Sequence, residues 1–227
     1  MICKSVVKII LDNLDTILSL RSDFALKHDN SYVSKGDLLV QELIFNFLKD
    51  NHPDYELISE EMELKPKWDQ NGSYIVLDPI DGTENFVSGL KEWGIGLSVY
   101  RNGNHEESAI FLPELNEFMF TGDKGNTFSS RIMGLSSSLS KSDLLDIEEG
   151  FEYRIIGCAM YNLWCVARGS YRSFHNPRGV NCWDILPGIN LAIEHNCDVW
   201  VDGKKYYGEI LFPVRKYKIK VLNRNDK

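Results

Sequence analysis

The most informative part of this sequence is an apolar run that leads directly into two carboxylates, Val76-Leu77-Asp78-Pro79-Ile80-Asp81-Gly82-Thr83-Glu84-Asn85-Phe86. The apolar residues predict a β-strand, and Gly82 and Thr83 predict a turn with a helix N-cap. Carboxylates on a stiff turn suit a hard cation such as Mg²⁺, which prefers oxygen ligands. A helix N-terminus just beyond them offers backbone N–H groups to a phosphate. An ordinary solvated Asp-Pro-x-Asp-Gly turn is the alternative at this point.

Further acidic residues follow or precede other predicted elements. Glu60 and Glu61 come directly after an apolar segment at 55–58, and Asp184 begins a predicted helix after Trp183. Acids placed in this way at the ends of separate elements favour a metal site over a solvated turn.

The hydrophobic pattern predicts layered α and β structure. Helical spacing occurs in 6–20 and 38–48, and a second pair of helices is predicted over 159–168 and 184–194. Strands are predicted at 55–58 and 73–77, followed by a meander over 93–100, 108–112 and 117–120. We expect one compact domain spanning 1–227, with an N-terminal half ending near residue 130 and a C-terminal half from about 131.

Composition restricts the partners of this chain. It has 227 residues and a net charge of −8, which excludes the basic surface of a general nucleic-acid binder. No apolar run approaches the roughly 18 residues that a membrane span requires. The first residues predict the start of a helix, not a signal peptide. The five cysteines form no CxxC pair, so we expect reduced, buried thiols and a cytoplasmic protein.

Taken together, these motifs resemble the inositol monophosphatase family of Mg²⁺-dependent phosphatases. Its D-P-x-D-G-T-x-N-F signature is matched by Asp78 to Phe86, its E-E pair by Glu60-Glu61 and its W-D motif by Trp183-Asp184. Two weaker matches in the same order are Ser34-Lys35-Gly36-Asp37 and Gly157-Cys158-Ala159, the latter resembling G-[ST]-A-A. The resemblance implies a layered αβαβα sandwich and, for Gly157, Cys158 and Ala159, a place beside the substrate.

The resemblance also implies the roles of individual residues. Two or three Mg²⁺ ions would be held by four carboxylates and one backbone carbonyl, from Glu60, Asp78, Ile80, Asp81 and Asp184. Thr83 and Asp37, with Glu60, would orient or deprotonate the attacking water, and the amides of Gly82 and Thr83 would hold the phosphate. Metal-activated water needs no nucleophilic side chain, which fits a sequence without a recognisable triad. The family resemblance further implies a homodimer.

Two departures concern the C-terminal half. The W-D motif continues with Pro187 where small residues are usual, which we expect to place the proline in the first helical turn. The acid that normally precedes the motif is absent, and Arg172, His175 and Arg178 stand in that region. These three predict either contacts to a more anionic substrate or residues at a rim or interface. A short segment before residue 154 implies a smaller cap over the site.

We therefore expect a Mg²⁺-dependent phosphatase that hydrolyses a small sugar or polyol phosphate. The alternatives are a 3′(2′),5′-bisphosphate nucleotidase or a fructose-1,6-bisphosphatase-like enzyme and, outside enzymes, an inactive metal-binding homologue. Glu84-Asn85-Phe86 departs from the D-G-T-[KR]-E-F pattern of the nucleotide phosphatases. Neither a nucleic-acid polymer nor a membrane is an expected partner.

Overall fold

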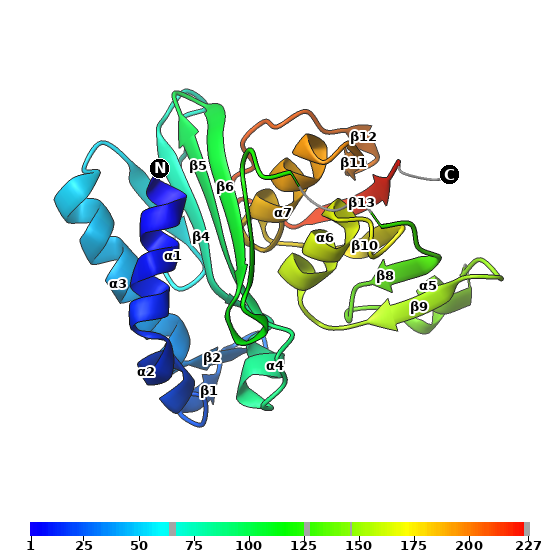
Figure 1. The fold of residues 1–227 in the computed structure, drawn as a ribbon, viewed down its shortest axis with the longest axis horizontal. Helices are drawn as coiled ribbons and strands as arrows, with labels where there is room; N and C mark the ends of the chain where they lie inside the picture. The colour runs from blue at the N-terminus through cyan, green and yellow to red at the C-terminus, as the bar shows by residue number, and fades with distance from the viewer. Residues whose placement is uncertain (64–66, 125–127, 146, 225–227) are drawn as a thin grey trace.

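The computed structural model describes residues 1–63, 67–124, 128–145 and 147–224. Its helices and strands form successive layers, with two sheets enclosing a central pair of helices (Figure 1). The first sheet follows the N-terminal half of the chain and the second follows the C-terminal half, with the change between Phe120 and Ile132.

The first sheet has five strands in sequence order. Only the β3–β4 pair is parallel. The strands are β3 (Glu56–Ser59), β4 (Tyr74–Asp81), β5 (Gly94–Arg101), β6 (Asn104–Leu112) and β7 (Glu117–Phe120). Every residue of β4 is buried, because helices cover both faces of the sheet. Ile75 and Leu77 pack toward the outer helices, whereas Tyr74 and Val76 join the core shared with the second sheet.

The outer helical layer covers the far face of the first sheet (Figure 1). It consists of α1 (Ile2–Asp12), α2 (Leu14–Ser19) and α3 (Lys35–Asn51). The helix predicted over 6–20 is therefore in two pieces. They meet at Asn13, whose backbone leaves helical geometry and whose side-chain amide donates to the Ile9 carbonyl at 2.8 Å. The asparagine side chain thus competes with backbone N–H groups for a helical carbonyl, which is why asparagine is unfavourable inside helices.

The central helices are α6 (Ala159–Ala167) and α7 (Cys182–Glu194). They pack on each other, on the first sheet and on the inner face of the second, so both halves of the chain share one core. Because Asn181 caps α7, the helix begins two residues earlier than predicted, and Pro187 lies inside it instead of in its first turn. Gly96 provides the space, since a Cβ there would lie 2.9 Å from Pro187 Cγ.

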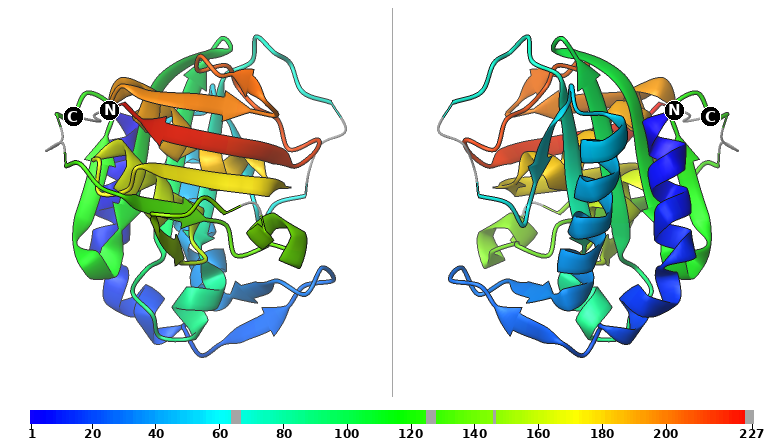
Figure 2. Two further views of the ribbon diagram at one scale, coloured as in Figure 1. Left: turned by 90° about the vertical axis from the view of Figure 1, so that its right-hand side faces the viewer. Right: turned by 90° about the vertical axis from the view of Figure 1, so that its left-hand side faces the viewer.

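The second sheet runs in the order β12-β11-β13-β10-β8-β9. Its strands are β8 (Ile132–Leu135), β9 (Glu152–Ile155), β10 (Ser173–Val180), β11 (Cys197–Val201), β12 (Lys204–Lys205) and β13 (Tyr217–Asn223). Figure 2 (left) shows its outer face toward the viewer, with the short helix α5 (Lys141–Leu145) at the edge. The architecture of the resembled family is confirmed, and α5 alone represents its last helical layer among the described elements.

Three small elements complete the described chain. A hairpin of β1 (Phe24–Leu26) and β2 (Tyr32–Ser34) precedes α3, α4 (Thr83–Val87) follows β4, and a 3₁₀ turn spans Pro113–Leu115. None of the described helices has the length and apolar character needed to cross a membrane. All five cysteines are buried and free, as predicted.

Candidate metal centre

Three carboxylates from distant parts of the sequence meet at one end of the first sheet. β3 and β4 are parallel and pair Ser59 with Leu77, so the next residues, Glu60 and Asp78, follow at the same edge. Asp184 reaches this edge as the third residue of α7. One carboxylate oxygen from each of Glu60, Asp78 and Asp184 lies within 4.8 Å of the other two. Three of the predicted ligands are thus brought together.

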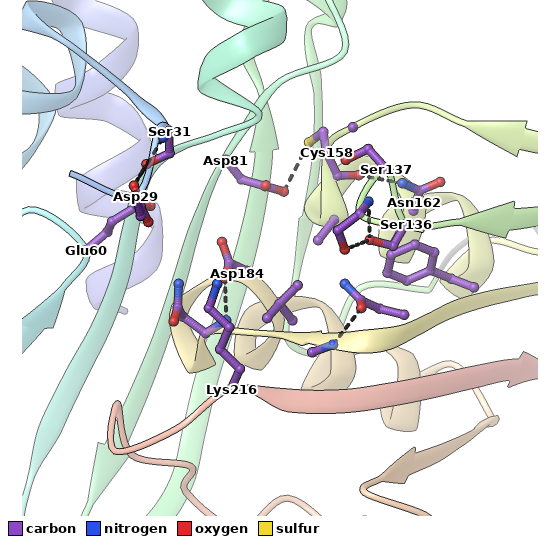
Figure 3. A pocket seen from close by; sticks show the side chains of 18 residues that line it. Asp29, Ser31, Glu60, Asp81, Ser136, Ser137, Cys158, Asn162, Asp184 and Lys216 are labelled. Atoms are coloured by element: carbon purple, nitrogen blue, oxygen red, sulfur yellow. Dashed lines mark hydrogen bonds between the residues drawn. The ribbon is translucent and has the colours of Figure 1, made fainter. Parts of the chain in front are cut away.

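Asp81 lies outside this group of three carboxylates but lines the cavity into which they open, which is described below. Its Oδ2 accepts hydrogen bonds from the backbone N–H of Met160 and from Cys158 Sγ, the latter at 3.1 Å. Figure 3 shows Asp81 and Asp184 facing the same space, with Glu60 across from them. The backbone carbonyl of Ile80, which is the predicted carbonyl ligand, accepts a hydrogen bond from the Thr83 hydroxyl at 3.0 Å. The Ile80 carbonyl is therefore part of the turn that ends β4.

The electrostatics of the cluster are those of crowded, buried acids. Burial, followed by the neighbouring Glu60, raises the pKa of both Asp78 and Asp184 well above the usual range. Burial also raises the pKa of Asp81 to about 7, although its hydrogen bond from Met160 opposes this. No N–H, hydroxyl or thiol group of the described residues donates a hydrogen bond to either oxygen of Asp78, whose carboxyl lies within hydrogen-bonding reach of the Asp184 carboxyl. A buried carboxylate without a partner is costly, and a hard divalent cation would remove that cost. The donor set therefore fits Mg²⁺.

Lys27 is a neighbour of the site that sequence reasoning missed. It follows β1, and its Nζ donates to Glu60 at 2.7 Å and to Glu61 at 2.6 Å. Glu61, whose pKa burial raises to about 7, is thus held beside the cluster without belonging to it. Lysine stands close to acids in many sequences, so no signal in the sequence marks this pair.

Asp37 and Thr83 are brought together, as the resemblance implied. Thr83 Oγ1 lies 3.3 Å from Asp37 Oδ1. Asp37 Oδ2 accepts from the backbone and hydroxyl of Ser34, which form a capping box at the start of α3. Burial raises the pKa of Asp37 to about 6. The helix cap after β4 is Gly82, with φ of +82°, which is one of the two residues predicted to form the turn and N-cap.

The cluster opens into a cavity of about 330 Å³. Gly157, Cys158 and Ala159 line it, in keeping with the expected place beside the substrate. Four of its lining residues are acidic, namely Asp29, Glu60, Asp81 and Asp184, and others carry neutral or cationic side chains, namely Ser136, Ser137, Ser138, Asn162, Phe174, Asn176, Asn181 and Lys216.

Arg172, His175 and Arg178 lie outside this cavity, which corrects the expectation that they contact substrate. Side chains alternate along β10, so Phe174 and Asn176 face the cavity, whereas His175 lines grooves on the outer face of the sheet. Arg178 pairs with Asp143 at 2.7 Å, and the Arg172 guanidinium lies 5.5 Å from the centre of the Phe151 ring. The period of two along β10 was the signal that could have identified Phe174 and Asn176.

Comparison with known proteins agrees with this geometry. The family model described as "Inositol monophosphatase family" matches residues 2–149, and the chain belongs to that family. A "Nus factor SuhB" from Pasteurella multocida is 27% identical over 194 residues, covering 74% of this chain and 71% of the relative. An "Inositol-1-monophosphatase" from Mesorhizobium japonicum is 28% identical over 193 residues, covering 75% and 72%.

Solved structures share the fold. A structure titled "IMPase/NADP phosphatase complexed with Mg2+ and phosphate" superimposes with a TM-score of 0.82 at 21% identity, covering 98% of this chain and 89% of that one. The IMPase of Thermotoga maritima gives a TM-score of 0.77 at 23% identity, covering 96% and 91%. The family and these relatives indicate a phosphatase of this superfamily.

Proposed function

We propose that the protein is a Mg²⁺-dependent phosphomonoesterase acting on a small sugar or polyol phosphate. The proposal is carried by one observation, the convergence of Glu60, Asp78 and Asp184, where no N–H, hydroxyl or thiol group of the described residues donates to either oxygen of buried Asp78. Asp184 also accepts from the Asn181 N–H at the start of α7, and Glu60 pairs with Lys27. Asp78 has no such partner among the described residues, and the mutual repulsion of the three acids opposes folding.

The chain's own groups divide the work. Glu60, Asp78, Asp81, Asp184 and the Ile80 carbonyl would hold two or three ions. Bound Mg²⁺ would lower the pKa of water and neutralise charge on the phosphate. The amides of Gly82 and Thr83 would bind phosphate oxygens, since the first amides of a helix have no partner within it.

Thr83 and Asp37 supply a route for the proton of the attacking water. The Thr83 hydroxyl has one proton and two acceptors, the Ile80 carbonyl at 3.0 Å and Asp37 Oδ1 at 3.3 Å. If a metal ion takes the Ile80 carbonyl, the hydroxyl would donate to Asp37 and its lone pairs would accept a hydrogen bond from water. Because burial raises the pKa of Asp37 to about 6, its carboxylate can accept a proton near neutral pH. The two residues would therefore both orient the water and receive its proton.

A cytoplasmic homodimer is part of the same proposal, on the basis of family membership. Sedimentation velocity should give a species of twice the chain mass of 26.1 kDa. A single species at the chain mass at micromolar concentration would contradict the dimer and leave the chemistry untouched.

Replacement of Asp81 tests the enzyme proposal. Phosphate release is measured from a panel of sugar, polyol and nucleotide monophosphates, with Mg²⁺ and with EDTA. We expect Asp81→Asn to lower the Mg²⁺-dependent rate by about a hundredfold or more, because one charged metal ligand is lost. Asp12→Asn, an exposed acid on α1, is the matched control and should keep the wild-type rate.

Two results would count against the proposal. Wild-type rates in a folded Asp81→Asn protein would show that the proposed metal site is wrong. Failure of the wild-type protein to release phosphate from any ester of the panel would favour the inactive, metal-binding homologue.

A further inference from the structure

A bulge in β10 fixes the orientation of one amide in the cavity wall. Against β13, Asn176 pairs with Ile219 and Val180 pairs with Tyr217, so β10 carries extra residues between these two pairs. Asn176 Oδ1 accepts from the backbone N–H groups of Arg178 at 3.1 Å and Gly179 at 2.9 Å. With its oxygen occupied by the bulge, Asn176 can offer the cavity only its Nδ2 donor.

That donor has no partner in the described part of the chain. Asn176 is 1% exposed and lines the cavity, so Nδ2 is held in the wall rather than dissolved in bulk water. A buried donor of this kind favours a ligand that supplies an acceptor.

Lys216 is brought to the same wall by the same bulge. Gly179 has φ of +90°, and a Cβ at this position would lie 3.1 Å from Lys216 Cβ. Glycine therefore lets the segment before β13 pass close to the bulge. Figure 3 shows the Lys216 side chain extending from this segment into the cavity, on the side of Asp184.

Lys216 is the one cationic side chain among the described residues that line the cavity, and it forms no ion pair with them. Asp29, across the cavity, already accepts two hydrogen bonds. Its Oδ1 accepts from the backbone N–H of Ser31 at 3.1 Å and from the Ser31 hydroxyl at 2.7 Å. The neighbouring hydroxyls of Ser136 and Ser138 bond to each other at 2.9 Å. This part of the cavity thus presents a fixed amide donor and an ammonium group that lies on the side of Asp184 without forming an ion pair with a described residue.

We propose that Lys216 Nζ and Asn176 Nδ2 form a subsite for a second anionic group, a carboxylate or a phosphate, on the substrate. This inference rests on the proposed function and narrows its substrate class to doubly anionic phosphate esters. A neutral polyol would satisfy Asn176 but would leave the ammonium group unpaired, whereas an anionic group would satisfy both donors.

Matched substrates test the preference. One pair, glycerol 3-phosphate and 3-phosphoglycerate, differs by a carboxylate, and the other, fructose 1-phosphate and fructose 1,6-bisphosphate, differs by a phosphate. We expect the wild-type kcat/KM to be about tenfold higher for the doubly anionic member of at least one pair. The pair that shows the preference identifies the anionic group. The ratio of kcat/KM for the doubly anionic member to kcat/KM for the singly anionic member should fall as the salt concentration is raised, because Lys216 is exposed.

Variants connect the preference to the two donors. Lys216→Ala should bring the ratio close to one through a higher KM for the doubly anionic substrate, and Lys216→Arg should restore it. Asn176→Asp keeps an oxygen for the bulge but replaces the donor with a negative charge, so it should favour the singly charged member. Lys218→Ala is the matched control, since Lys218 is exposed two residues along on the outer face of the sheet and should leave the ratio unchanged.

The possible failures differ from one another. Equal kcat/KM values for both members of both pairs, or a full preference retained in Lys216→Ala, would overturn the inference and leave the phosphatase standing. Absence of phosphate release from all four esters and from the wider panel would overturn the proposed function itself, and the inference with it.

Discussion

Asp78 lies in a strand whose residues are all buried, and no N–H, hydroxyl or thiol group of the described chain donates a hydrogen bond to either of its oxygens. Its neighbours add negative charge and provide no compensation, since Glu60, Asp81 and Asp184 all raise its pKa after burial itself. Without a cation, folding must therefore either bury this charge or bind a proton. The residue best suited to hold a metal is also a source of instability in its absence.

Asp78→Asn should consequently stabilise the metal-free protein while abolishing its response to Mg²⁺. The amide keeps the size of the side chain and removes one buried charge from a crowded group of acids. At pH 7.5 in EDTA we expect the free energy of unfolding in urea to rise by about 1–3 kcal/mol. Asp12→Asn should change it by less than about 0.5 kcal/mol. A destabilised Asp78→Asn protein would show that the charge is already compensated in the wild type.

The pH dependence of the metal-free protein follows from the same raised pKa values. An acid with a higher pKa in the folded state binds more protons when folded, so stability is lost as pH rises from about 4 through the folded-state pKa. The folded-state pKa is about 6 for Asp37 and about 7 for Asp81, so the pH range over which stability is lost ends near neutrality. Urea unfolding in EDTA should give about 2 kcal/mol more stability at pH 5.5 than at pH 8. A stability that rises over this range would contradict the burial of these acids.

At the scale of residues, the sequence predicted the acids better than the substrate contacts. Glu60, Asp78 and Asp184 could be placed because each ends or begins an element, and such ends meet at one edge. The substrate contact considered for His175 and Arg178 was wrong because charge alone does not say which face of β10 a side chain occupies. Lys216 could not be found, since a bulge and a close backbone approach bring it to the cavity.

The contact between α6 and α7 depends on Gly188. A Cβ added at Gly188 would lie 2.4 Å from Leu163 Cδ1 and 2.5 Å from Leu163 Cβ. Gly188→Ala should therefore destabilise the protein by about 1–3 kcal/mol, as overpacking of a core does. In a double-mutant cycle with Leu163→Ala, the two losses should be less than additive by about 1 kcal/mol. Strict additivity would mean that the helices separate instead of meeting at this pair.

At the scale of elements, the period of the hydrophobic pattern located most helices and strands, and local polar chemistry set their ends. At the break at Asn13, a side-chain amide donates to the Ile9 carbonyl, and at the start of α7 the Asp184 carboxylate accepts from the Asn181 backbone N–H at 2.7 Å. The hairpin of β1 and β2 was missed, because two three-residue strands contain too few residues to show a period.

For the whole molecule, a bound cation would add a link between parts of the fold that otherwise meet through packing and through hydrogen bonds such as that from Asn190 Nδ2 to the Tyr100 hydroxyl at 2.8 Å. Asp78 and Asp81 belong to β4 and Glu60 directly follows β3 of the first sheet, whereas Asp184 belongs to α7 in the central layer. Mg²⁺ at about 100 times its dissociation constant should add about 2.7 kcal/mol of stability, which is a rise of several degrees in Tm. Asp184→Asn should remove most of this rise. Equal Tm values in Mg²⁺ and EDTA would contradict the joining of these elements.

Translation supplies the strands of the second sheet in an order that differs from their order in space. β10 and β11 are both made before β13, yet they do not pair with each other, because β13 lies between them. Until residues 217–223 have left the ribosome, both strands keep an unpaired edge that invites association with other nascent chains. α7, which connects them and carries Asp184, lacks a finished sheet to rest on during this interval. During synthesis the carboxylates of the proposed metal site are therefore present before the second sheet is complete, and we expect the chain to bind a cation only after β13 has been made.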